Sequence, residues 1–89
     1  NISTYDKITI GPDVKQQLDN DLALEIAALV VLRDGIKTCV EVADDASREL
    51  LEHILVDEEE HVDWIETQLH QITEVGYQNY LTQQIKEKD

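Results

Sequence analysis

Apolar residues recur along most of this chain at alternating steps of three and four positions. From residue 14 to about residue 42 the sequence has no proline and a single glycine, and a second run with the same spacing extends from residue 45 to about residue 75. Such spacing is typical of a helix that buries one face. It predicts two long helices, over residues 13–42 and 45–75, with a short polar break at Asp44 and Asp45.

Turn signals mark the ends of these runs. Residues 1–12 lack a sustained period and end in Gly-Pro, which favours a loop with Pro12 near the start of the first helix. Gly76 follows the second run and is placed to cap its carboxyl end. Residues 77–86 then have the pattern of a short amphipathic helix. The sequence therefore predicts an all-α fold, with one antiparallel helix hairpin and a short C-terminal helix.

Three polar residues interrupt the expected inner faces of the two long helices. The inner face of the first comprises Leu18, Leu22, Glu25, Leu29, Leu32, Ile36 and Cys39, and that of the second comprises Leu51, Ile54, Glu58, His61, Ile65, Gln68 and Ile72. Asp57, Glu59 and Glu60 point to other sides of the helix, mostly to water. Glu25, Glu58 and His61 are thus the ligand-type residues that we expect to face inward.

The same three residues lie at similar depths in the hairpin. At about 1.5 Å per residue, Glu25 is roughly 27 Å before the break and Glu58 roughly 20 Å after it. That difference is within reach of tilted helices and long carboxylate side chains. We expect Glu25, Glu58 and His61 to meet at one level of the hairpin.

Two carboxylates and an imidazole at one level point to a metal site. A carboxylate in an apolar core is costly, and two of them raise each other's pKa, whereas a divalent cation relieves both effects. Carboxylate oxygen with imidazole nitrogen suits iron, manganese or zinc. One Glu and one Glu-x-x-His are half of the donor set of a di-iron site in a four-helix bundle. A second hairpin must supply the other half.

Charge and composition limit the kinds of partner that this chain can bind. The 89 residues carry a formal net charge of −13, which disfavours nucleic acids and anionic lipid surfaces and attracts cations. The apolar run over residues 22–32 is too short to span a membrane. The only cysteine, Cys39, is expected to be a small buried apolar residue. We expect a cytoplasmic protein, and, because the sequence has no methionine, a chain cut from a longer one.

Several stretches of the sequence resemble the second half of bacterioferritin. These are DLALE at 21–25, DEEEHVDWIETQL at 57–69 and GYQNYLTQQI at 76–85. The resemblance implies a ferritin-like four-helix bundle in which residues 1–12 end the crossover loop, 13–42 form helix C, 45–75 form helix D and 77–86 form helix E. It implies that Glu25, Glu58 and His61 are iron ligands of a ferroxidase, which oxidises Fe(II) with dioxygen or peroxide.

The resemblance also implies storage of Fe(III) mineral in a cage of 24 subunits, with helices A and B of the same subunit as a partner. Bacterioferritins bind haem through a methionine of helix B, so haem b is expected only together with that half. Trp64, three residues after His61, is either a nearby electron donor or a packing aromatic.

Two alternatives keep the same residues but change their setting. Two copies of the hairpin can pair about a two-fold axis and build a ferroxidase site, a plan similar to that of encapsulated ferritins. A purely structural oligomerisation module would explain the apolar faces, although it leaves unexplained why Glu25, Glu58 and His61 interrupt them.

Overall fold

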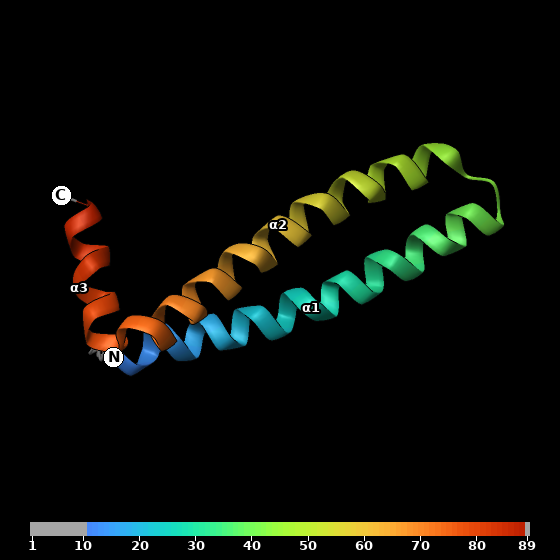
Figure 1. The fold of residues 1–89 in the computed structure, drawn as a ribbon. Coiled ribbons are helices and arrows are strands. Elements are labelled where there is room, and N and C mark those ends of the chain that lie inside the picture. Colours follow the sequence, from blue (N-terminus) through green and yellow to red (C-terminus); the bar gives the residue numbers. More distant parts are fainter. Residues whose placement is uncertain (1–10, 89) are drawn as a thin grey trace, which may run out of the picture.

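Two long antiparallel helices form a hairpin, and a third, shorter helix turns away at its open end (Figure 1). The computed structural model describes residues 11–88. Helix α1 covers Gly11–Glu41, α2 covers Asp45–Val75 and α3 covers Tyr77–Lys88. No strand occurs among these residues. The all-α class predicted from the sequence is confirmed.

The first helix begins earlier than the pattern indicated. Residues 1–10 of the expected loop lie outside the described residues, whereas Gly11 and Pro12 belong to α1 and not to a loop. Proline is accepted there because the first turn of a helix needs no backbone N–H donors. At the other end, α3 continues to Lys88, two residues beyond the predicted limit.

The ends of α2 are set by local hydrogen bonds. The Asp44 side chain caps the amino end by accepting a hydrogen bond from the backbone N–H of Ser47 at 3.1 Å. At the carboxyl end, the N–H of Gly76 donates to the carbonyl of Ile72 at 2.9 Å, as predicted for a capping glycine. Gly76 has φ of 88° and ψ of 150°, a backbone conformation that is strained for any residue other than glycine. This corner turns the chain from α2 into α3.

The buried core lies at the end of the hairpin where α3 begins. Leu18, Ile65, Ile72 and Tyr80 are buried against one another. Inside this core the hydroxyl of Tyr80 donates a hydrogen bond of 2.7 Å to Oε1 of Gln68, so the one buried polar side chain of the described residues has a partner. This contact fixes α3 against α2.

The inner face of α1 is the predicted one, but that of α2 is rotated. Every predicted inner residue of α1 is buried or half-buried. On α2, Ile54 and His61 were expected to face inward and are exposed, whereas Val62 is buried. The buried or half-buried residues of α2 that follow the same spacing of three and four are Leu51, Leu55, Glu58, Val62, Ile65, Leu69 and Ile72. We call these residues and the inner face of α1 the seam.

Candidate metal centre

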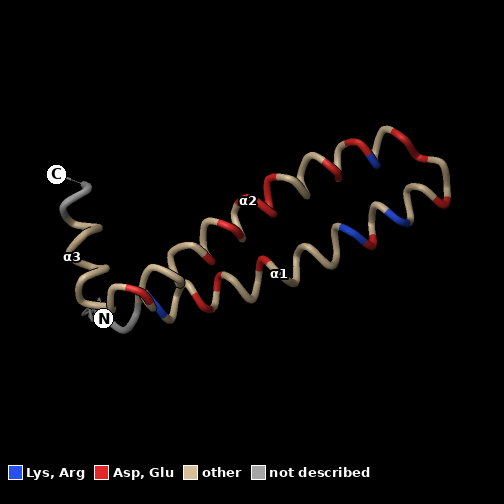
Figure 2. The backbone as a smooth tube through the Cα atoms, in the orientation of Figure 1, with Lys and Arg blue, Asp and Glu red and all other residues tan. Residues whose placement is uncertain are grey.

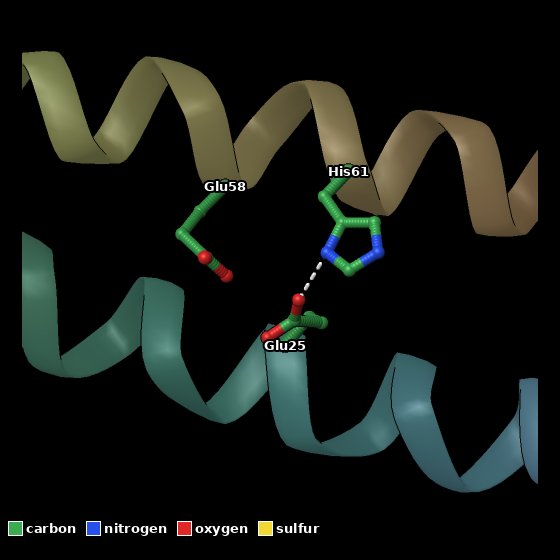
Figure 3. A group of neighbouring side chains, drawn as sticks. All are labelled: Glu25, Glu58 and His61. Carbon is green, nitrogen blue, oxygen red and sulfur yellow. Dashed lines mark ion pairs between the residues drawn. The ribbon is translucent and has the colours of Figure 1, made fainter.

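Two carboxylates in the middle of the seam and a histidine beside it lie close together. Glu25 comes from α1, and Glu58 and His61 come from successive turns of α2, so that all three side chains point into the gap between the helices (Figure 3). One ligand atom from each residue lies within 4.8 Å of those from the other two. The expected meeting of these residues at one level of the hairpin is confirmed.

Local helix geometry explains how α2 presents two of the three groups. Residues three apart on a helix project from the same side, which is why Glu58 and His61 both reach Glu25. Nδ1 of His61 contacts Oε2 of Glu25 (Figure 3). The His61 side chain is 51% exposed and that of Glu25 is 21% exposed, so the group is open on one side.

Glu58 carries the unfavourable electrostatics of this cluster. Its Oε2 is buried and has no hydrogen-bond partner among the described residues. The carboxyl group of Glu25, close enough to share a proton with Glu58, raises the pKa of Glu58, and burial and repulsion from the Glu25 charge raise it further. Attraction to the imidazole of His61 lowers the pKa of Glu58. A negative charge on Glu58 is therefore poorly stabilised by the protein alone.

Among the described residues, no lysine or arginine pairs with Glu25 or Glu58. The sequence has no Lys or Arg between Lys15 and Arg33, or between Arg48 and Lys86. Figure 2 shows the result, because acidic residues line both helices around the group while basic residues of α1 and α2 gather mainly toward the turn. Among the described residues, only the imidazole of His61 pairs with these carboxylates, and a divalent cation supplies the further positive charge that they need.

The remaining sequence expectations meet different outcomes. Cys39 is buried, as expected. Asp57, Glu59 and Glu60 are exposed, as expected. Trp64 is 55% exposed, so within this chain it is not a packed aromatic. Its role as an electron donor stays a prediction. Sequence reasoning missed the Tyr80–Gln68 contact, for which the apolar spacing gives no signal.

Comparison with known proteins decides the family. The ferritin-like domain family matches residues 1–75. This chain belongs to the ferritin-like family. It is 40% identical over 83 residues to a bacterioferritin of Mycobacterium bovis, a match that covers 93% of this chain and 52% of that protein. The same figures hold for bacterioferritin BfrA of Mycobacterium tuberculosis.

A bacterial ferritin of Synechocystis sp. is 39% identical over 85 residues, covering 94% of this chain and 54% of the relative. The chain thus spans about half the length of the curated relatives that it matches. None of the described helices is long and apolar enough to cross a membrane.

Proposed function

We propose that this chain takes part in iron storage and detoxification by oxidising Fe(II) to Fe(III) at a di-iron carboxylate centre. The observation that carries this proposal is the meeting of Glu25, Glu58 and His61 within 4.8 Å, with one buried Glu58 oxygen unpaired. Membership of the ferritin-like family and the bacterioferritin relatives support iron as the metal.

Fe(II) is the substrate in this proposal, and the protein supplies its ligands. Two Fe(II) ions each lose one electron, and peroxide takes up the two electrons and two protons to give two molecules of water. The carboxylates of Glu25 and Glu58 offset the charge of the cations and favour the ferric product. His61 adds a nitrogen ligand from the open side of the group. The acidic surroundings attract the cations to the site.

The centre is half complete in one copy of the chain. A di-iron site in a helix bundle takes four glutamates and two histidines, and this hairpin offers two glutamates and one histidine. In a bacterioferritin-like subunit the other half comes from helices A and B, packed on the hairpin in a four-helix bundle. This proposal also includes the assembly of such subunits into a cage of 24 and a cytoplasmic location. It places haem b at a site that includes the other half of the subunit.

Iron oxidation in the assembled protein, with the second helix pair present, tests the proposal. Following Fe(III) formation by absorbance, we expect Glu58→Ala to slow oxidation by at least about tenfold, since it removes a metal ligand. Glu60→Gln is the matched control, because it removes an exposed carboxylate two residues away and should oxidise iron at the wild-type rate. Equal rates for wild type and Glu58→Ala would contradict the proposed centre. A wild type without iron oxidation would favour the oligomerisation module.

A further inference from the structure

The spacing of α2 allows either of two sets of residues to turn toward α1. Both sets share the residues that recur every seven positions, which are Leu51, Glu58, Ile65 and Ile72. The first set adds Ile54, His61 and Gln68, and the second adds Leu55, Val62 and Leu69. At about 100° per residue, the two arrangements differ by a roll of roughly 40° about the axis of α2. The structure adopts the second set, whose added residues are apolar and buried or half-buried. We call Ile54, His61 and Gln68 the edge row.

Within the edge row, Gln68 alone is buried. Ile54 is 39% exposed and the side chain of His61 is 51% exposed, whereas Gln68 is 8% exposed. The difference comes from α3, because Tyr80 lies over Gln68 and its hydroxyl donates a hydrogen bond of 2.7 Å to Oε1. At this end of the hairpin, α3 therefore occupies the side of α2 that stays open at the level of His61.

Other contacts hold α3 in place as well. The hydroxyl of Tyr77 accepts a hydrogen bond from the backbone N–H of Lys15 on α1 at 3.3 Å. Tyr77 and Leu81 also pack against the buried core, which comprises Leu18, Ile65, Ile72 and Tyr80. Because α3 is anchored to both long helices, the hydroxyl of Tyr80 has a fixed place relative to the hairpin.

The hydrogen bond between Tyr80 and Gln68 resists a roll of α2. Rolling α2 into the first arrangement would turn the amide of Gln68 away from Tyr80 and into the apolar seam. The amide would then be buried without this bond, which is unfavourable. An apolar residue at position 68 has no such preference. The polar character of Gln68 thus adds to the apolar packing of the seam in setting the roll.

Gln68 and His61 are coupled through the helix itself. They are seven residues apart, which is about two turns and roughly 10 Å, so their side chains project in nearly the same direction. A helix rolls as a unit over so short a distance. The roll that keeps Gln68 under Tyr80 therefore holds the imidazole of His61 beside the seam, where its Nδ1 contacts Oε2 of Glu25 (Figure 3).

We propose that Gln68 and Tyr80 are positioning residues of the metal centre, because their hydrogen bond fixes the roll of α2 that presents His61 to a cation. The inference rests on the proposed metal-binding function, but its statement about the roll also applies to the metal-free chain. The two residues act through the helix and do not bind the metal themselves. The C-terminal helix thus has a part in the centre although it adds no residue to the three-residue group.

The double variant Gln68→Leu/Tyr80→Phe removes the hydrogen bond and leaves an apolar contact in its place. Replacing both partners of a buried hydrogen bond by apolar groups of similar shape changes stability little. A purely structural role of the bond thus predicts a variant that folds and binds metal like the wild type. Gln68→Glu is the conservative variant, because it keeps an oxygen that accepts the Tyr80 hydroxyl. Tyr77→Phe is the matched control, since it removes a hydroxyl of α3 that bonds to α1 and not to α2.

Co(II) binding by the assembled protein, with the second helix pair present, is the first measurement. Co(II) serves as the probe because its absorption reports its ligands. We expect the double variant to bind Co(II) at least about tenfold more weakly than the wild type and with an altered spectrum. Gln68→Glu should restore the wild-type spectrum, and Tyr77→Phe should leave it unchanged.

Chemical accessibility of His61 in the metal-free full chain is the second measurement. Diethyl pyrocarbonate modifies accessible imidazoles, and His53 and His70, which are both exposed, provide internal references. In the double variant the imidazole of His61 turns into the seam for part of the time. We therefore expect its modification rate, followed by mass spectrometry, to fall by at least about twofold relative to these references. Tyr77→Phe should keep the wild-type rate.

The two measurements separate the different failures. A folded double variant with the wild-type Co(II) spectrum and the wild-type modification rate overturns the positioning role. A weaker Co(II) affinity that Gln68→Glu does not restore, with an unchanged modification rate, overturns it as well. Tyr80→Phe alone replaces a double variant that fails to fold, and the same outcomes decide. A wild type that binds no Co(II) counts against the proposed function, whereas the modification rates still decide whether the hydrogen bond sets the roll.

Discussion

At the scale of single residues, Glu58 is where the proposed metal site makes the metal-free fold less stable. Its Oε2 is buried without a hydrogen-bond partner among the described residues, and a second carboxyl group lies beside it. Burying a polar atom in this way is unfavourable unless a partner or an ion compensates. An apolar residue of similar size would suit the metal-free fold better. The presence of a carboxylate at this position is thus an argument for a cation.

Replacing Glu58 by leucine should separate stability from metal binding. We expect the metal-free Glu58→Leu protein to unfold at a higher temperature than the wild type, because the unpaired buried carboxylate is removed. We also expect Co(II) to raise the unfolding temperature of the wild type but not that of the variant. Scanning calorimetry with and without Co(II) measures both effects. Glu60→Leu, at an exposed position, should show no such rise in unfolding temperature. A metal-free Glu58→Leu protein that is less stable than the wild type would count against this account.

The sequence was sufficient to predict that Glu25, Glu58 and His61 meet, but not how each is covered. Spacing along a helix fixes the angle at which Glu25 and Glu58 project, and both lie in the seam as expected. The exposure of His61 depends on the roll of α2 against α1. That roll is decided by the packing of residues such as Val62, whose burial no local pattern requires. Periodicity alone therefore cannot give it.

At the scale of elements, the hairpin turn depends on one capping residue. The side chain of Asp44 accepts a hydrogen bond from the backbone N–H of Ser47. Hydrogen bonds from the side chain and the backbone of Ser47 lower the pKa of Asp44 from its ordinary value of 3.8. The backbone here also needs a left-handed residue, Ala43, with φ of 58°. The polar break was readable from the sequence because Asp favours caps. The conformation of Ala43 was not, since alanine gives no such signal.

The capping bond of Asp44 should leave a mark on the pH dependence of folding. A carboxylate whose pKa is lower in the folded state stabilises that state at pH values above 3.8, and this contribution is lost as pH falls through the depressed pKa. We expect Asp44→Ala to be less stable than the wild type at pH 6, with a difference that shrinks below pH 3.8. Urea unfolding of the assembled protein followed by circular dichroism measures this difference. Asp45→Ala is the control, because Asp45 is next in sequence and takes no part in the capping hydrogen bond. A difference in stability between Asp44→Ala and the wild type that stays constant from pH 6 to pH 3 would contradict the role of Asp44 as the cap.

At the scale of the whole molecule, charge is the property that most distinguishes this chain. It has 20 acidic residues and 7 basic ones. The ion pairs Lys15–Asp19, Arg33–Glu59 and Arg48–Glu52 are all partly exposed, and pairs of this kind contribute about 0–1 kcal/mol each. They do not offset the repulsion among the remaining carboxylates. The same repulsion that weakens the fold makes the region around Glu25 and Glu58 attractive to cations.

Salt should therefore move folding and metal binding in opposite directions. Raising NaCl from about 0.02 to 0.5 M shortens the screening length to a few ångströms, so the urea midpoint of the metal-free protein should rise as repulsion is screened. The dissociation constant for Co(II), measured by titration of its absorption, should rise as well, because screening weakens the attraction of the acidic surroundings. KCl at equal ionic strength should give the same two shifts. A urea midpoint that falls with salt would mean that the exposed ion pairs outweigh the repulsion. An unchanged affinity for Co(II) would mean that cation binding depends on the ligands alone and not on the charge around them.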